Sequence, residues 1–158
     1  MRSNDIFARM TPKRAEAFLA ELRRDAPPIA QLALAAAAGA FKLRPVFIRK
    51  QPRAKQAEWM RKALARGTMA TTAEEILAQY FLEHRRTLLV EWLDQLGLEH
   101  EEGVLTGDTP ECPSEETLRK AVDEFRSDQD SEQRELLLQA FAAQSAIDWA
   151  PLEKLIEV

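Results

Sequence analysis

The chain has 158 residues, which suits one domain with its own core, and its hydrophobic (46%) and charged (30%) fractions exclude a disordered protein. Its single cysteine, Cys112, excludes an internal disulfide and a cysteine-based zinc site within one chain. The net charge of −4 hides an asymmetry, because residues 1–70 carry a net charge of +10 and residues 71–158 carry −14. Five glycines and one asparagine leave few turn formers, so the composition favours helices.

The N-terminal residues carry no targeting signal. The first 25 residues contain charges of both signs and no apolar stretch typical of a signal peptide. The longest apolar run, residues 29–41, is too short to cross a bilayer. We therefore expect a soluble cytoplasmic protein with no membrane partner, and a flexible tail over residues 1–10.

The first predicted helix begins at Thr11, a good N-cap that precedes a proline, and continues to residue 26. Residues 28–41 form the next helix, which is rich in alanine and apolar on all sides, as is typical of a buried helix. Residues 42–51 are ambiguous between a strand fragment and a short helical turn from Pro45. The turn is favoured because no partner strand is visible. Another helix is expected from Pro52 to a C-terminal Gly67.

Capping boxes at residues 71–75 predict the start of the following helix. Residues 72–97 form either one kinked helix or two helices that meet near residues 83–87, and two are favoured. Residues 97–113 are predicted to form the longest loop, and three further helices are expected from Ser114, Asp130 and Asp148. The predicted fold is therefore all-α: a single domain over residues 1–158, built as a compact bundle of seven or eight short helices around the alanine-rich helix.

A basic segment is the sharpest feature of the sequence. Residues 42–66 contain nine Lys or Arg and one acid, Glu58, with a tryptophan among them. Cations neutralise phosphates and an aromatic ring can stack on a base, so the pattern is typical of an anion-binding surface. The candidate surface for an anionic partner consists of Lys42, Arg44, Arg49, Lys50, Arg53, Lys55, Trp59, Lys62 and Arg66.

Two interpretations of this segment stay open. The cations either form an exposed binding face or pair with the acidic second half of the chain, with Trp59 as an anchor of its helix. The overall pI of about 5.4 and the lack of any known nucleic-acid-binding motif weigh against a nucleic acid.

The sequence predicts no cofactor and no metal site. His84 and His100 lie sixteen residues apart, a spacing that fits no known metal-binding pattern. Cys112 has no neighbour in sequence that would activate its thiol. No phosphate-binding loop, dinucleotide-binding motif or serine-nucleophile motif is present, so catalysis is not expected and no catalytic residue is assigned.

The first hypothesis for function is a protein–protein interaction or structural module. Its partner would be another protein or a second copy of the chain, as in a homodimer whose acidic face meets a basic one. The alternative is nucleic-acid binding through residues 42–66. A third hypothesis is a helical ligand-binding or enzymatic bundle with a pocket near Trp59, Trp92 or Trp149.

Overall fold

The computed structural model describes residues 1–157, which form ten α-helices and one two-stranded hairpin. Contacts divide the chain into two compact units. The N-terminal unit is Arg2–Tyr80, and the C-terminal unit comprises Met1 and the chain from Phe81 onward. The predicted all-α class is therefore confirmed, but the predicted count of seven or eight helices is too low. A single domain over residues 1–158 stays a prediction.

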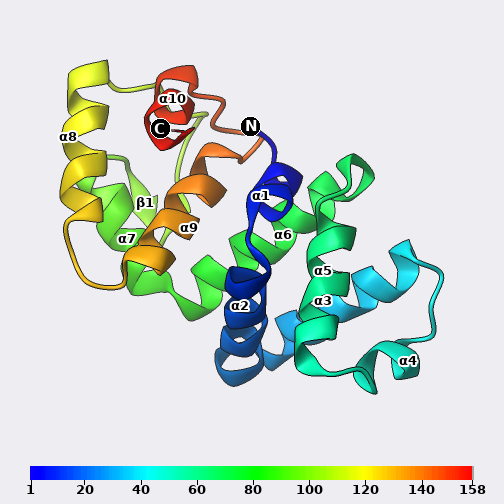
Figure 1. The fold of residues 1–158 in the computed structure, drawn as a ribbon. Helices are drawn as coiled ribbons and strands as arrows, with labels where there is room; N and C mark the ends of the chain where they lie inside the picture. The colour runs from blue at the N-terminus through cyan, green and yellow to red at the C-terminus, as the bar shows by residue number, and fades with distance from the viewer. Residues whose placement is uncertain (158) are drawn as a thin grey trace. The chain divides into compact units, whose positions relative to one another are not determined.

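The N-terminal unit is built from six α-helices and one short 3₁₀ turn (Figure 1). In chain order these are α1 (Ser3–Arg9), α2 (Pro12–Asp25), α3 (Pro27–Ala40), α4 (Pro45–Arg49), α5 (Arg53–Leu64), η1 (Gly67–Met69) and α6 (Ala70–Gln79).

Helix α1 corrects the prediction of a flexible tail over residues 1–10. Ile6 and Phe7 are buried, and Phe7 packs against Phe18 of α2 with ring centroids 6.1 Å apart. The side chain of Asn4 donates a hydrogen bond to the carbonyl oxygen of Ala65 after α5. Burial of these two apolar side chains stabilises the docked helix by about 2 kcal/mol each.

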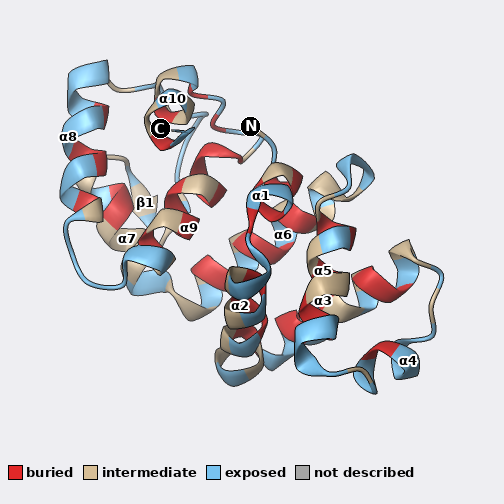
Figure 2. Ribbon diagram, viewed as in Figure 1, coloured by how far each residue is buried: buried red, intermediate tan, exposed pale blue. Residues whose placement is uncertain are grey.

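Helix α2 begins as predicted, because the Thr11 hydroxyl accepts a hydrogen bond from the backbone N–H of Arg14 at 3.1 Å. Helix α3 is less buried than predicted. It contacts α2, α4, α5 and α6, and Ala33 and Ala37 are fully buried, but Leu32 is exposed. Figure 2 shows both buried and exposed positions along this helix. The small side chains allow neighbouring helices to approach α3 closely, and an outer face stays in contact with solvent.

The end of α3 positions α4. Lys42 adopts a left-handed conformation with φ of 54°, and the N–H groups of Lys42 and Leu43 donate to the carbonyl oxygens of Gly39 and Ala38. This pair of hydrogen bonds is a Schellman motif, in which glycine is the usual residue at the left-handed position. The chain then enters α4 at Pro45, so the predicted helical turn is confirmed and the strand alternative is wrong.

The C-terminal unit contains four α-helices and the hairpin. Its elements are α7 (Arg86–Gln95), β1 (His100–Glu101), β2 (Val104–Leu105), α8 (Glu115–Arg126), α9 (Ser131–Ala142) and α10 (Ala150–Glu157). The core residue Trp92 is fully buried and packs against Phe125 and Phe141 with ring centroids 5.2 and 5.9 Å apart, and Phe141 packs in turn on Trp149.

Residues 72–97 are two helices, as favoured by the sequence. A π-helical segment, Tyr80–His84, lies between α6 and α7. The predicted capping boxes at residues 71–75 do not form, because the 3₁₀ turn Gly67–Met69 runs directly into α6 and places both threonines inside the helix. Gly67 belongs to that turn and does not end α5 as predicted. Within residues 1–157, no helix is long and apolar enough to span a bilayer.

Candidate interaction surface on α4 and α5

The eight cations of the predicted surface are all exposed. Four of them lie on α4 and α5, and the others lie in the segments that flank these helices. Within residues 2–80, the structure gives an ion pair to only one of the eight, between Lys62 and Glu58 at 3.8 Å. Pairing of the basic segment with the acidic half concerns contacts between the units and stays a prediction.

A small core fixes the position of these cations. Ile48 of α4 and Ala63 of α5 are fully buried against Ala37 and Ala38 of α3. Burial of the Ile48 side chain contributes about 2 kcal/mol, which ties the five-residue α4 to its neighbours. A helix this short is unstable alone, so the fixed direction of its side chains depends on this contact.

Trp59 anchors its helix, as one interpretation of the sequence expected. Its ring packs edge-on against Phe41, with centroids 4.8 Å apart, and one part of the ring stays exposed. The Arg66 guanidinium covers another side of Phe41, with its carbon 4.2 Å from the ring centroid, and donates to the carbonyl oxygen of Ala40. The Trp59 ring is therefore partly covered by its own unit and partly open to solvent.

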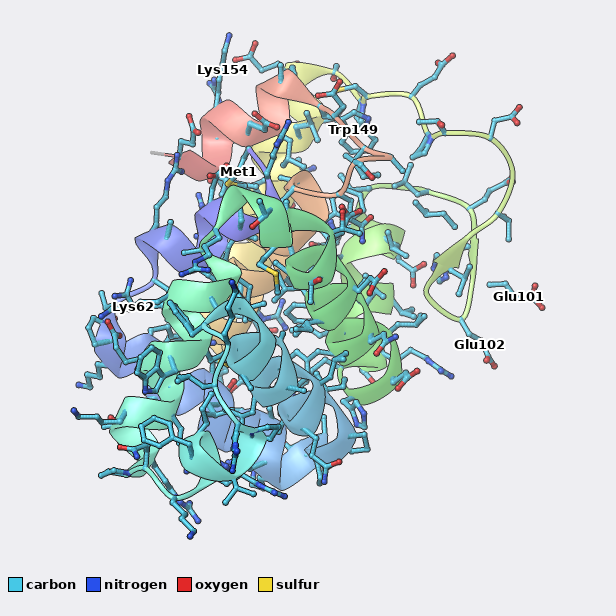
Figure 3. All side chains as sticks on the ribbon, turned by 90° about the vertical axis from the view of Figure 1, so that its right-hand side faces the viewer. Met1, Lys62, Glu101, Glu102, Trp149 and Lys154 are labelled. Carbon is cyan, nitrogen blue, oxygen red and sulfur yellow. The ribbon has the colours of Figure 1, made fainter. Side chains whose placement is uncertain are left out.

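A groove of about 360 Å³ lies between α4 and the outer side of α5. We call it the α4–α5 groove. Phe47 lies on one side of it and is 46% exposed, an unusual degree of exposure for a phenylalanine. Lysines lie along α5, and the side chain of Lys62 extends away from the ribbon in Figure 3. The lining residues are Phe47, Gln51, Ala54, Lys55, Glu58, Trp59 and Lys62.

The one acid of the groove is already occupied. Both oxygens of Glu58 accept hydrogen bonds from Arg61, at 2.7 and 2.9 Å. This contact lowers the pKa of Glu58 below its ordinary value, so the carboxylate stays charged at neutral pH. Glu58 therefore holds Arg61 in place and also lies 3.8 Å from the Lys62 ammonium, so Lys55 is the groove lysine to which no carboxylate within residues 2–80 is paired.

The structure divides the predicted surface between two pockets and leaves four of its cations outside both. Lys55, Trp59 and Lys62 meet in the α4–α5 groove, whereas Arg49 and Arg53 line a second pocket on another side of α5. Lys42 and Arg44 lie in the connection before α4. The remaining two cations, Lys50 and Arg66, line neither pocket.

Sequence reasoning missed two exposed apolar residues beside the cations. Val46 and Phe47 are 47% and 46% exposed, and the sequence analysis assigned neither of them to the candidate surface. The short length of α4 could have indicated their exposure, because a one-turn helix can bury only one side, here the side of Ile48. Arg23 was also missed, because it lies far from the basic segment in sequence and reaches the second pocket from α2.

The side chains of the two histidines and of the cysteine contact residues close to them in sequence. His100 Nε2 lies 2.6 Å from a carboxylate oxygen of Asp94, and His100 Nδ1 accepts a hydrogen bond from the N–H of Gly103, which closes the hairpin turn. His84 lies 3.8 Å from Glu83 at the end of the π-helical segment. The Cys112 thiol is exposed and donates to the carbonyl oxygen of Pro113, and partial burial raises the pKa of this thiol.

The other two tryptophans belong to the core of the C-terminal unit, where Trp92 and Trp149 are both buried. Within residues 1–157, no three His, Cys, Asp or Glu side chains are grouped so that they could hold a metal ion. Among the described residues 1–157, the α4–α5 groove combines exposed apolar surface with the unpaired cation Lys55. No protein family, curated protein or solved structure matches this chain.

Proposed function

We propose that the chain is a protein–protein interaction module whose α4–α5 groove binds a segment of a partner protein that carries both apolar and acidic side chains. The observation that carries the proposal is the exposed ring of Phe47 beside the half-buried Trp59, with Lys55 and Lys62 along the same groove. Exposed apolar surface next to charge is typical of a docking site. Burial of the apolar surface supplies affinity, and the charges orient the partner.

Charge complementarity supports an acidic partner. The N-terminal unit carries fifteen Lys or Arg and seven Asp or Glu, a net charge of +8. The lysines flank an apolar centre, so a matching segment has its apolar side chains in the middle and its acids at either end. A helix with this pattern would use the groove as a helix-in-groove ligand.

The same features favour a protein over a nucleic acid. Trp59 is half-buried and packs against Phe41, so only part of its ring is open to stack on a base. The Glu58 carboxylate in the groove would repel a continuous phosphate backbone. The experiment must distinguish binding of a partner protein from two alternatives, which are nucleic-acid binding and self-association through the acidic half of a second copy.

Fluorescence anisotropy with the full chain tests the proposal. The probes are a labelled amphipathic peptide with leucine and glutamate side chains, a neutral peptide with glutamine in place of glutamate, and single- and double-stranded oligonucleotides. Binding of the acidic peptide alone supports the proposal. Phe47→Ala should weaken that binding by about tenfold, the loss expected when roughly half of a phenylalanine contact area is removed.

Charge variants complete the test. Lys55→Glu with Lys62→Glu should abolish peptide binding, whereas Arg119→Glu with Lys120→Glu is a matched control because these exposed cations lie on α8 of the other unit. Tighter binding of an oligonucleotide than of the acidic peptide would overturn the proposal in favour of nucleic-acid binding. Self-association lost in the Lys55→Glu and Lys62→Glu variant would identify a second copy as the partner.

A further inference from the structure

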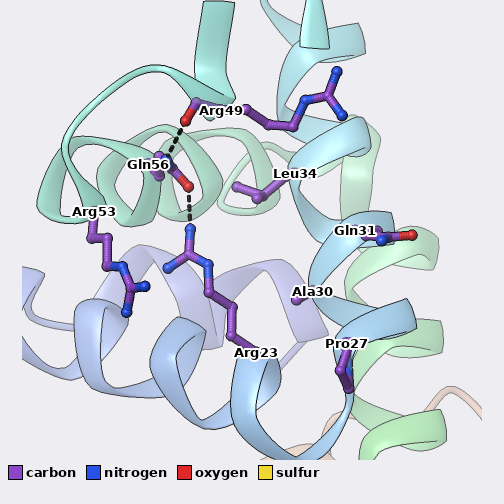
Figure 4. Close-up of a pocket in the computed structure, with 8 residues that line it drawn as sticks. All are labelled: Arg23, Pro27, Ala30, Gln31, Leu34, Arg49, Arg53 and Gln56. Atoms are coloured by element: carbon purple, nitrogen blue, oxygen red, sulfur yellow. Dashed lines mark hydrogen bonds between the residues drawn. The ribbon is translucent and has the colours of Figure 1, made fainter. Parts of the chain in front are cut away.

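A second pocket of about 390 Å³ lies on the side of α5 that faces α2 and α3 (Figure 4). We call it the arginine pocket. Three arginines from three helices line it: Arg23 from α2, Arg49 from the end of α4 and Arg53 from the start of α5. It shares no lining residue with the α4–α5 groove, so a ligand of this pocket is independent of the function proposed for that groove.

The charge of this pocket is one-sided. No carboxylate lines it, and within residues 2–80 none forms an ion pair with Arg23, Arg49 or Arg53. Burial, together with the charge of Arg53, lowers the pKa of the Arg23 guanidinium from its ordinary value. Arginine nevertheless stays protonated in proteins, so the pocket holds positive charge that nothing in the unit neutralises.

One arginine is positioned in advance. The side chain of Gln56 is 6% exposed, and its Nε2 donates to the carbonyl oxygens of Arg49 and Gln51 at 3.0 and 2.8 Å. These bonds orient its Oε1, which accepts a hydrogen bond from Arg23. In Figure 4, the guanidiniums of Arg23 and Arg53 lie on the same side of the pocket, and the Arg49 side chain extends along the top of the view toward α3. Fixing the Arg23 side chain before a ligand arrives reduces the entropy lost on binding.

We propose that the arginine pocket binds a phosphate monoester. Guanidinium groups form paired hydrogen bonds to phosphate oxygens, and a dianionic phosphate offers enough acceptors for several of them at once. A carboxylate, with one charge and two oxygens, would satisfy a single guanidinium and leave the others unpaired. The number of arginines and the absence of any acid thus favour phosphate over carboxylate.

The other wall of the pocket supports an ester over inorganic phosphate. Ala30 and Leu34 of α3 line it on the side across from Arg53 (Figure 4). The volume lies within the range of small-molecule pockets, which leaves space beyond a phosphate group. An organic substituent on the phosphate would contact this apolar wall. The phosphate could belong to a small molecule or to a phosphorylated side chain of another protein.

Isothermal titration of the full chain with phenyl phosphate, inorganic phosphate and benzoate tests the proposal. Phenyl phosphate should bind more tightly than inorganic phosphate and at least about tenfold more tightly than benzoate. Its affinity should fall as the pH drops below about 6, where the phosphate loses its second charge. No binding of phenyl phosphate at low salt, or equal binding of benzoate, would overturn the proposal.

Variants locate the site. Arg53→Gln and Arg49→Gln should each weaken phenyl phosphate binding by about tenfold or more, while Arg44→Gln, an equal charge loss on an exposed arginine outside the pocket, should change it by less than about twofold. Equal losses in all three variants would show diffuse attraction and overturn the proposal. Arg53→Lys keeps the charge but loses the planar guanidinium, so it should also weaken phenyl phosphate binding. This variant tests the site even if Arg53→Gln fails to fold.

The two sources of phosphate are distinguished by a phosphoserine peptide. A peptide that binds at least about tenfold more tightly than phenyl phosphate would assign the pocket to a phosphorylated protein partner. Equal affinities would assign it to a small phosphorylated molecule, because the peptide chain would then add no contact. The unphosphorylated peptide serves as the control, and its equal binding would overturn the proposal.

Discussion

Arg23 of α2 donates a hydrogen bond to the side chain of Gln56 on α5, which is almost completely buried. The amide of Gln56 also donates to two carbonyl oxygens in the connection between α4 and α5. One side chain therefore ties together three helices of the N-terminal unit. The hydrogen bonds of Gln56 hold Arg23 in the arginine pocket and the backbone of Gln51 beside the α4–α5 groove. The positions of residues in both candidate sites therefore depend on Gln56.

Gln56→Leu should destabilise the N-terminal unit, because it leaves the carbonyl oxygens of Arg49 and Gln51 without their donor. Each buried group left unpaired costs about 1–3 kcal/mol. Thermal or urea unfolding of the variant measures the loss. Gln31→Leu on the exposed side of α3 is the control, since its side chain is exposed, and a similar loss in both variants would contradict the structural role assigned to Gln56.

Lys42→Gly should stabilise the chain. Lys42 ends α3 in the left-handed conformation, whereas Gly97 occupies the same position at the end of α7, with the same two hydrogen bonds behind it. A non-glycine residue in that conformation costs about 1 kcal/mol, and glycine removes most of this cost.

The measurement is the midpoint of urea unfolding. Lys42→Ala is the matched control, since it also removes the charge but keeps a Cβ, and it should give no gain. Equal stabilisation by alanine and glycine would show that relief of charge repulsion, and not backbone conformation, is the cause.

Arg134→Ala should destabilise the C-terminal unit strongly. Arg134 is 6% exposed, forms two hydrogen bonds with Glu91 at 2.8 and 3.0 Å, and lies over the ring of Phe125. Its removal should cost about 2 kcal/mol, because the packing on Phe125 is lost and the buried carbonyl oxygen of Phe125 loses its donor. Glu91 is 39% exposed, so water can replace the lost partner of this carboxylate. Arg119→Ala, at an exposed pair with Glu115, should cost less than about 0.5 kcal/mol. Similar losses in both variants would contradict this assignment.

Cys112 should react slowly for an exposed thiol. Partial burial raises its pKa, and the hydrogen bond to the carbonyl oxygen of Pro113 favours the protonated form. Alkylation requires the thiolate, so the pH at which the rate is half-maximal should be higher in the folded protein than in urea. An equal or lower pH in the folded protein would show that the thiol is activated instead.

Local signals in the sequence predicted much of the fold. The caps at Thr11 and Ser114 formed as expected, because a hydroxyl beside free N–H groups is a short-range interaction. The predicted cap at Asp130 did not form, since Asp130 is left-handed with φ of 62° and makes no side-chain capping bond. The short helix α1 was missed because its stability comes from tertiary contacts of Phe7, which local pattern cannot reveal.

The candidate sites were predicted only in part. Sequence identified the cations of residues 42–66, because composition alone shows an excess of charge. Helical spacing places Lys55, Trp59 and Lys62 along one side of their helix, but it could not show that this side forms a groove with α4 or that Arg53 lines a different pocket. Arg23 joins Arg49 and Arg53 through tertiary packing, which no local pattern encodes.

The most direct test of the proposed function uses the three tryptophan indole N–H signals in a two-dimensional NMR titration of the full chain with the acidic amphipathic peptide. The Trp59 signal should shift progressively, because its ring lines the α4–α5 groove. The signals of Trp92 and Trp149 should stay fixed, since both rings are buried in the core of the C-terminal unit. An unmoved Trp59 signal at saturating peptide would contradict the proposal.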